Sequence, residues 1–141
     1  PVVAYGHRDR LEGACTIRGV PLLDPSDAPD QPSVLYLPED AEDDARNRAI
    51  DHAKQHGSIL VYDLGAAWNA NPLDTEAHDL ATQTICIGDL GAAFGADAWR
   101  IGFLTAPTVQ VGALRDFKQA LTICTTALSQ WGTLALVETQ A

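Results

Sequence analysis

The stretch TICIGDLGAAFGADAWRIGFLTAP, residues 84–107, decides the fold that this sequence predicts. It begins with an apolar strand at residues 84–87, continues through a loop broken by glycines, and ends in a second strand near residues 101–104. Upstream, SILVY at residues 58–62 is bounded by glycine and aspartate, which is typical of a strand buried on both faces. Such strands alternate with helical segments, so we expect an α/β fold with a mostly parallel sheet and flanking helices.

Three shorter strands are predicted at residues 2–5, 20–23 and 34–37. Residues 6–19 favour a helix, and residues 39–56 place alanines at every fourth position, the periodicity of a helix with a narrow apolar stripe. Acidic residues in its first turns complement the positive end of the helix dipole, and Gly57 is the expected C-terminal cap. Residues 24–33 predict a solvent-exposed loop, and residues 73–82 a polar helical turn.

From residue 108 onward the sequence predicts a helix to the end of the chain. The adjacent Thr125 and Thr126 are expected to bend or interrupt it, because hydroxyl side chains compete for backbone hydrogen bonds. Its apolar side chains recur at spacings of three and four: Leu114, Phe117, Leu121, Cys124, Leu128 and Trp131. This spacing predicts a single apolar face, which is more often core than interface. We expect residues 1–141 to form one domain.

Composition excludes several classes of partner. Nineteen acidic and nine basic residues give a net charge of −10, which argues against binding to nucleic acid or to an anionic membrane surface. No apolar run approaches the roughly 20 residues of a membrane span and no signal-peptide pattern is present, so the cytoplasm is the expected location. Cys15, Cys86 and Cys124 are widely spaced and indicate reduced, mostly buried thiols, without a disulfide framework or zinc site.

Phe94-Gly95 and WRIGF at residues 99–103 resemble the active-site segment of fold-type I pyridoxal-phosphate (PLP) enzymes, the aspartate aminotransferase superfamily. The pattern in that family is S-K-x-F-G-x-x-G-W-R-x-G-Y. SILVYDLGAAW and the helix after residue 107 are also similar to family segments, and VLYLPEDAED stands in place of the family's N-P-x-N-P-T-G loop. The resemblance implies a reduced PLP-transferase-like large domain, with the N-terminal phosphate-loop region and the C-terminal small domain of the family absent from residues 1–141.

The resemblance assigns roles residue by residue. The position of the Schiff-base lysine is Ala92, which implies that covalent cofactor attachment and the lysine's acid–base chemistry are lost. Asp63 corresponds to the aspartate that pairs with the pyridine nitrogen, and Arg100 to the arginine that binds the cofactor phosphate. The tyrosine that contacts the ring oxygen is replaced by Ala66, and the serine before the lysine by Gly91.

These replacements favour a protein that does not transaminate and that binds a small anion or acts as a subunit or scaffold. No covalent cofactor is expected, and non-covalent binding of PLP stays open. One alternative is a PLP-independent enzyme that reuses the old pocket, with Asp63 as general base and Arg100 as an oxyanion or carboxylate anchor. Another is a fragment of a true PLP-dependent amino-acid aminotransferase.

Structural roles are also open for these residues. Asp63 can cap a turn, and Arg100 can form an ion pair with Asp63 or Asp89. In the family the large domains pair, and a chain without its outer domain exposes apolar surface. We therefore expect a homodimer, or a heterodimer with a related subunit.

The histidines and the first residue carry less specific signals. His52 and His56 lie four residues apart on the predicted helix, close enough to share a metal, but no third ligand is marked. A solvated helix face is the preferred interpretation, and no metal is expected. Pro1 is a secondary amine that needs an apolar pocket to act as base or nucleophile, and the sequence indicates none.

Overall fold

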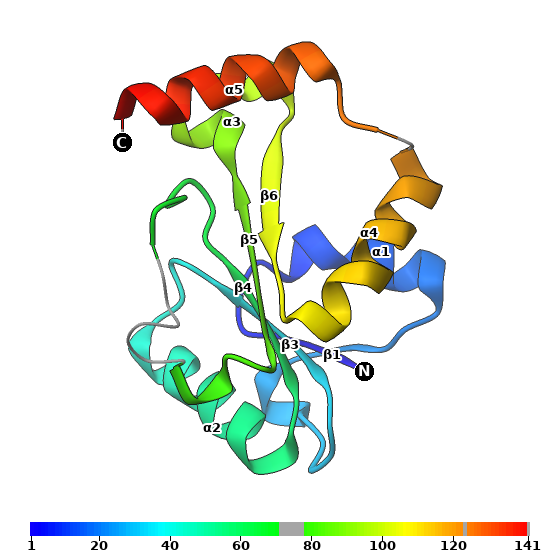
Figure 1. The fold of residues 1–141 in the computed structure, drawn as a ribbon. Coiled ribbons are helices and arrows are strands. Elements are labelled where there is room, and N and C mark those ends of the chain that lie inside the picture. Colours follow the sequence, from blue (N-terminus) through cyan, green and yellow to red (C-terminus); the bar gives the residue numbers. More distant parts are fainter. Residues whose placement is uncertain (71–77, 123, 141) are drawn as a thin grey trace.

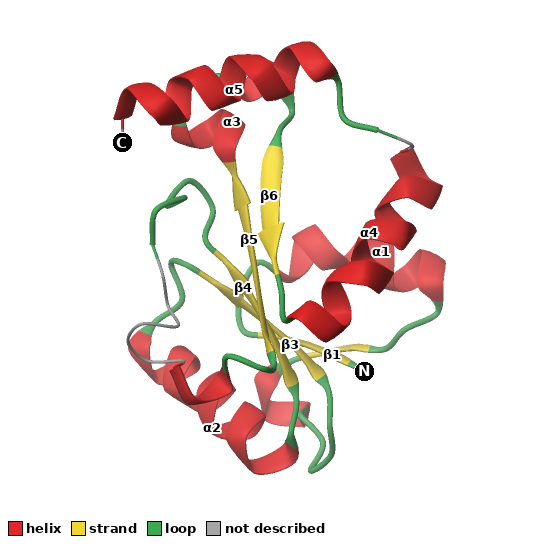
Figure 2. Ribbon diagram, viewed as in Figure 1, coloured by secondary structure: helices red, strands yellow, loops and turns green. Residues whose placement is uncertain are grey.

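The computed structural model describes residues 1–70, 78–122 and 124–140 and contains a six-stranded sheet (Figures 1 and 2). The strands are β1 (Val2–Ala4), β2 (Leu22–Leu23), β3 (Val34–Pro38), β4 (Ile59–Asp63), β5 (Thr84–Asp89) and β6 (Gly102–Thr105). Their order across the sheet is β2-β1-β3-β4-β5-β6, and every neighbouring pair is parallel except β5 and β6. The predicted α/β fold with a mostly parallel sheet is therefore confirmed.

The helices are α1 (Arg8–Arg18), α2 (Asp43–His56), α3 (Leu90–Ala93), α4 (Thr108–Thr122) and α5 (Ala127–Gln140). Short 3-10 turns occupy Pro25–Asp27, His78–Leu80 and Asp97–Trp99. Figure 1 shows α2 on one side of the sheet and α1 and α4 on the other, while α5 lies beside α3 beyond the end of β5. The predicted turn at residues 73–82 contains the one at His78–Leu80, and its residues 73–77 lie outside the described part of the chain.

The core lies between the sheet and α2. Alternate strand residues, including Val3, Leu35 and Leu60, are fully buried on this face. The opposing helix buries Ala49, Ile50 and Ala53, members of the predicted apolar stripe. Complete burial of a large aliphatic side chain contributes about 1.5–3 kcal/mol, so this layer stabilises the sheet most.

The ends of α2 follow from local chemistry. The helix begins at Asp43, four residues later than the sequence predicted, because Pro38 ends β3 and residues 39–42 form a turn. The guanidinium of Arg46 in the first turns donates to the Glu39 and Ala41 carbonyls and thereby ties this turn to the helix. At the other end Gly57 is the C-terminal cap, as predicted, and its backbone N–H donates to the Ala53 carbonyl.

The C-terminal segment is divided into two helices, α4 and α5. The predicted interruption at Thr125 and Thr126 is confirmed, and the Thr125 hydroxyl accepts a hydrogen bond from Lys118 Nζ at 3.1 Å. The expectation that the apolar side chains of this segment lie in the core is wrong, because α4 contains no buried residue and Leu128 and Trp131 are 81% and 71% exposed. Cys124 is exposed as well, whereas Cys15 and Cys86 are buried as expected.

In the described part of the chain, α4 contacts α1, and α5 contacts the turn Asp97–Trp99. The Arg18 guanidinium of α1 lies 5.6 Å from the centre of the Phe117 ring on α4. The backbone of Gly132 on α5 passes against the Trp99 ring, so closely that a Cβ at residue 132 would lie 2.4 Å from it. Among the described helices, none combines the length and apolar character needed to cross a membrane.

Candidate functional site

The carboxyl ends of the parallel strands meet at one edge of the sheet, where α/β proteins bind ligands. Backbone hydrogen bonds join the loops there: Leu64 N–H donates to the Ile87 carbonyl, and Asp89 N–H donates to the Gly65 carbonyl. The turn after β3 adds the Glu39 carboxylate, which lies so close to Gly65 that a Cβ at residue 65 would be 2.1 Å from Oε1. This edge therefore brings several acidic groups together.

Asp63, the last residue of β4, is held by three donors. Its Oδ2 accepts the Tyr36 hydroxyl at 2.5 Å and lies 3.5 Å from Arg10 Nη1, while Oδ1 accepts the Gly65 N–H at 3.0 Å. The Asp63 side chain is only 16% exposed. Burial, and then the hydrogen bond to Asp63, raise the pKa of Tyr36 to about 12, so the phenol stays protonated and donating at neutral pH.

Ala92 lies on α3, the short helix after β5. The carboxylate of Asp89 caps this helix and accepts the Ala92 N–H at 3.0 Å. The Gly91 N–H donates to the Ile101 carbonyl, which joins α3 to the chain entering β6. The Ala92 side chain is exposed, so a methyl group stands at the position that the resemblance gives to the Schiff-base lysine.

Arg100 follows the turn Asp97–Trp99 in the left-handed conformation, with φ of +49°. Its exposed side chain lines an open cavity of about 190 Å³ together with Gly88, Asp89, Ile101 and Gly102. Within the described part of the chain it forms neither of the ion pairs considered from the sequence, and Asp63 does not line this cavity. Asp63 and Arg100 thus lie at the same edge without sharing a cavity.

Two groups that hold Asp63 were missed from the sequence. Tyr36 lies two residues before Pro38, which pairs with Asp63 in the sheet, so strand alternation places Tyr36 on the same face as Asp63. Strand alternation predicts this placement only after the pairing of β3 with β4 is known. Arg10 comes from α1, and no sequence pattern connects it to the end of β4.

The other sequence-derived candidates have structural partners. His52 forms hydrogen bonds through both ring nitrogens, Nε2 to the Pro29 carbonyl at 3.0 Å and Nδ1 to Ser58 Oγ at 3.2 Å. Its ring centre lies 4.6 Å from that of His56. In the described part, no group of three His, Cys, Asp or Glu side chains is arranged to hold a metal. The Pro1 carbonyl accepts the Val34 N–H at the start of β3.

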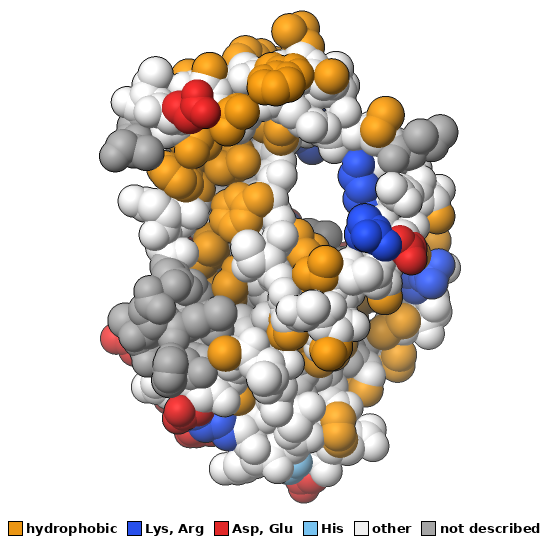
Figure 3. Space-filling model, viewed as in Figure 1, with side chains coloured by type: hydrophobic (Ala, Val, Ile, Leu, Met, Phe, Trp, Pro, Cys, Tyr) orange, Lys and Arg blue, Asp and Glu red, His pale blue; other side chains and the backbone are white. Residues whose placement is uncertain are grey.

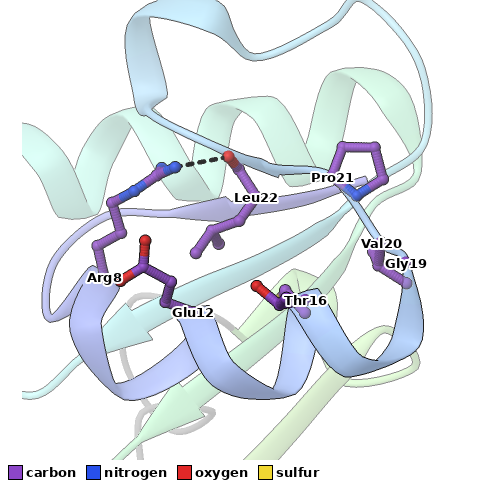
Figure 4. A pocket seen from close by; sticks show the side chains of 8 residues that line it. Arg8, Glu12, Thr16, Gly19, Val20, Pro21 and Leu22 are labelled. Atoms are coloured by element: carbon purple, nitrogen blue, oxygen red, sulfur yellow. Dashed lines mark hydrogen bonds between the residues drawn. The ribbon is translucent and has the colours of Figure 1, made fainter.

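A larger cavity, about 410 Å³, lies away from this edge between α1 and residues 19–22 (Figure 4). Arg8 extends across it toward Leu22, to whose carbonyl it donates at 2.9 Å, and it pairs with Asp24 at 3.2 Å. Glu12 and Thr16 line the same side from α1. The guanidinium thereby covers a backbone acceptor of the edge strand β2.

The protein is an α/β protein with a mostly parallel sheet and one antiparallel edge strand. Its loops converge at the carboxyl ends of the strands. Among solved structures this fold is shared with a PLP-dependent aminotransferase from Streptococcus suis, at a TM-score of 0.75 and 13% identity over 99% of this chain and 44% of that one. YbdL from Escherichia coli, described with a methionine aminotransferase function, matches at a TM-score of 0.72 and 14% identity over 97% of this chain and 43% of that one.

Tetra mutant 1 of the Thermus thermophilus aspartate aminotransferase matches at a TM-score of 0.70 and 14% identity, covering 94% of this chain and 44% of that one. The chain thus has the fold of part of a PLP-dependent aminotransferase and spans less than half the length of these solved chains. No family model matches the sequence. No curated protein matches it either.

The residues at the corresponding positions do not fit covalently bound PLP. Ala92 has no amine, and the carboxylate of Asp63 is already engaged by Tyr36 and Arg10. Asp89 and Arg100 line the same cavity, so a carboxylate and a guanidinium lie there together. The two lysines lie elsewhere: Lys54 pairs with Asp79 at 3.6 Å, and Lys118 bonds to the link between α4 and α5.

Proposed function

We propose that this protein is a non-transaminating relative of the aminotransferase fold that acts as a small-anion-binding subunit. The observation that carries the proposal is Ala92, since no other side chain supplies an amine at the end of β5. Asp63 is consistent with it, because Tyr36 and Arg10 hold the carboxylate in place and so give it a structural role without a cofactor. The aminotransferase activity of the matched structures is therefore not carried over.

The anion is proposed to bind at Arg100. The guanidinium is exposed, has no partner among the described residues, and lines a cavity with Gly88 and Gly102. One oxygen of the Asp89 carboxylate in this cavity already accepts the Ala92 N–H. The volume of about 190 Å³ suits phosphate or a small carboxylate better than a phosphorylated ring.

Titration with inorganic phosphate, followed by the backbone amide NMR signals of Gly88 and Gly102, tests the anion site. We expect saturable shifts that an Arg100→Gln variant weakens about ten-fold, because a charge-assisted contact is lost. Arg115→Gln is the matched control, since Arg115 is an exposed arginine that pairs only with its neighbour Asp116 among the described residues. Equal affinity of the Arg100 variant and the control would refute the site.

Addition of PLP, with an absorption scan and borohydride trapping, tests the loss of covalent chemistry. We expect no stoichiometric Schiff base, and only slow modification at Lys54, Lys118 or the terminal amine. A specific, saturating adduct on one lysine would overturn the proposal of a non-transaminating protein.

The competing hypothesis is a PLP-independent enzyme with Asp63 as general base. It requires that the Asp63→Asn variant lose turnover of its substrate while the fold persists.

A subunit role is supported by the C-terminal segment, residues 99–141. Nine large hydrophobic side chains in its described part are exposed: Trp99, Leu104, Val109, Val111, Phe117, Leu121, Leu128, Trp131 and Leu134. Figure 3 shows hydrophobic side chains gathered over α5 and along the neighbouring strands, and an opening between β6 and α4. Exposed apolar patches are frequent at sites of protein association. We propose that a second copy of the chain, or a related subunit, covers it.

Sedimentation of the protein and of its Trp131→Glu variant tests this association. We expect the chain to dimerise and the variant to be monomeric, because a carboxylate in an apolar interface is left without solvent or partner. Ile17→Glu is the control, since Ile17 is 85% exposed on α1, outside the C-terminal segment. A monomeric chain at high concentration would contradict the homodimer and leave the related subunit as the partner to seek. The cytoplasm remains the predicted location.

A further inference from the structure

The two edges of the sheet differ in how well their backbone groups are protected. β2 forms one edge and β6 the other, because the strand order is β2-β1-β3-β4-β5-β6. An edge strand presents backbone N–H and C=O groups that can pair with another chain, and native proteins usually block them. The difference between the two edges therefore indicates where a further strand can add.

The edge at β2 is blocked. The strand is two residues long and follows Pro21, which has no N–H. The Pro21 carbonyl accepts the Val2 N–H of β1, so alternation along the strand turns the backbone groups of Leu22 away from β1. On this outer side the Leu22 carbonyl already accepts a hydrogen bond from the Arg8 guanidinium at 2.9 Å.

The direction of the backbone groups of β6 follows from its pairing with β5. The Ile87 carbonyl on β5 accepts a backbone N–H from the residue after β4 at 2.8 Å, so it faces β4. The next residue, Gly88, therefore faces β6 and exchanges hydrogen bonds with Phe103, its partner in the register. The backbone groups of Phe103 thus point toward β5, and those of its neighbours Gly102 and Leu104 point outward.

The edge at β6 is open. The outward N–H and C=O groups of Gly102 and Leu104 have no hydrogen-bond partner among the described residues. Gly102 is exposed, and Leu104 is 45% exposed. Proline and charged side chains are the usual devices that block an edge, and the strand Gly102–Thr105 has neither. This edge is therefore available to a further strand.

The space beside β6 limits what can bind there. Figure 3 shows an opening between β6 and α4, next to the free edge. Because α4 lies across this opening, the space suits a single extended segment and not the edge of a second folded sheet. Phe103 packs against the core on one face of the sheet, so alternation places Leu104 on the other face. A segment beside them lies next to apolar side chains on both faces.

We propose that the free edge of β6 binds an extended, uncharged segment of a partner chain as a further strand. The segment exchanges backbone hydrogen bonds with Gly102 and Leu104, and its alternate side chains pack beside Phe103 and Leu104. The inference rests on the proposed subunit role and names the strand through which a partner chain attaches.

Titration with the uncharged peptide acetyl-Thr-Val-Thr-Val-Thr-amide tests this inference, because β-branched residues favour an extended backbone. We expect saturable binding and slower hydrogen exchange of the Gly102 and Leu104 amides, which become donors. The Phe103 and Thr105 amides should change less, since they already donate to β5. The Leu22 amide, on the blocked edge, should not shift. Absence of saturable binding would overturn the inference.

An N-methylated peptide is the matched control on the side of the ligand. Methylation of two adjacent residues removes one donor from each edge of the peptide, because neighbouring residues point their N–H groups in opposite directions. This peptide should bind the unmodified protein at least about ten-fold more weakly. Equal affinity of the two peptides would show adsorption to apolar surface and would overturn the inference.

Leu104→Pro and Leu104→Ala are the matched variants of the protein. Both remove the leucine side chain, but only proline removes the outward N–H, and neither removes a hydrogen bond to β5. Leu104→Pro should weaken peptide binding at least about ten-fold, and Leu104→Ala about three-fold or less. Equal affinity of the two variants would also overturn the inference. Circular dichroism confirms that each variant is folded.

Sedimentation separates this inference from the proposed homodimer. Peptide binding by a chain that stays monomeric would support the β6 edge and contradict the homodimer. A dimer that binds no peptide would leave the proposed apolar interface in place and overturn only the strand addition.

Discussion

The burial of apolar side chains differs between two parts of the chain, residues 1–98 and the C-terminal segment, residues 99–141. The largest fully buried side chains of the described protein belong to the first region, on β1, β3, β4 and β5 and at Ser58, just before β4. Of the eleven large hydrophobic side chains that are exposed among the described residues, nine belong to the second. The first region forms a core with α2, whereas the second presents its apolar faces to solvent.

The numbers of charged residues also differ between these two parts of the chain. Residues 1–98 contain seventeen acidic and six basic residues, whereas residues 99–141 contain two acidic and three basic ones. Charge depletion together with exposed aromatic and aliphatic side chains is the composition of an interface core. A protein of net charge −10 also associates with itself at least cost through the face that carries the fewest acids. The difference is the basis of the proposal that a second subunit covers the C-terminal segment, whereas residues 1–98 form their own core.

Hydrogen exchange should show the largest contrast between the two regions. We expect amides of β3 and β4 to exchange only through global unfolding, and amides of α4 and α5 to exchange at least about a hundred-fold faster through local opening. The reason is that α4 buries no residue, whereas β3 and β4 lie in the middle of the sheet. Measurement at low protein concentration keeps the chain from associating. Uniform protection of all four elements would contradict the contrast.

Paired truncations should give the next largest difference. Leu35→Ala removes a fully buried side chain and should lower the free energy of unfolding by about 2–5 kcal/mol. Leu128→Ala removes an exposed one and should change it by about 0.5 kcal/mol or less in the monomer. Urea denaturation below the concentration at which the chain associates measures both. A cost for Leu128→Ala close to that of Leu35→Ala would mean that α5 is covered within the monomer.

Much of the first region was predictable from local patterns. Short apolar runs indicated the strands, the alanine periodicity indicated the buried face of α2, and Gly57 marked its end. These signals are reliable because strand alternation and helix periodicity arise within a few residues of chain. The start of α2 was displaced, since the acidic run at residues 39–42 suits a helix but follows Pro38 in a turn.

The C-terminal segment and the candidate site were harder to predict, for two different reasons. Periodicity shows that a helix has an apolar face but not what covers it, so Leu128 and Trp131 were expected in a core that does not reach them. The candidate site needed partners far apart in sequence: Arg10 contacts Asp63 across 53 residues. Position 92 was the exception, because the absence of an amine there can be read directly from the sequence.

The polar cluster around Asp63 provides a test, with a smaller expected effect, of whether residues 1–98 exclude solvent at the carboxyl edge of the sheet. Because the pKa of Tyr36 is raised to about 12 in the folded protein, the unfolded phenol loses its proton first as the pH rises above 10. The stabilisation from this group is therefore complete below pH 10 and is lost between about pH 10 and 12. From pH 9 to pH 11 the unmodified protein should lose about 1 kcal/mol more of its free energy of unfolding than the Tyr36→Phe variant.

Urea denaturation at the two pH values measures this difference, and the variant serves as the reference because every other titrating group is common to both proteins. Tyr36→Phe is also expected to be less stable at pH 9, since Asp63 then loses a donor while buried. That constant offset does not affect the pH dependence. If the two proteins lost the same free energy between pH 9 and pH 11, the phenol would be neither buried nor held by the carboxylate. The carboxyl edge of the first region would then be as open to solvent as the C-terminal segment.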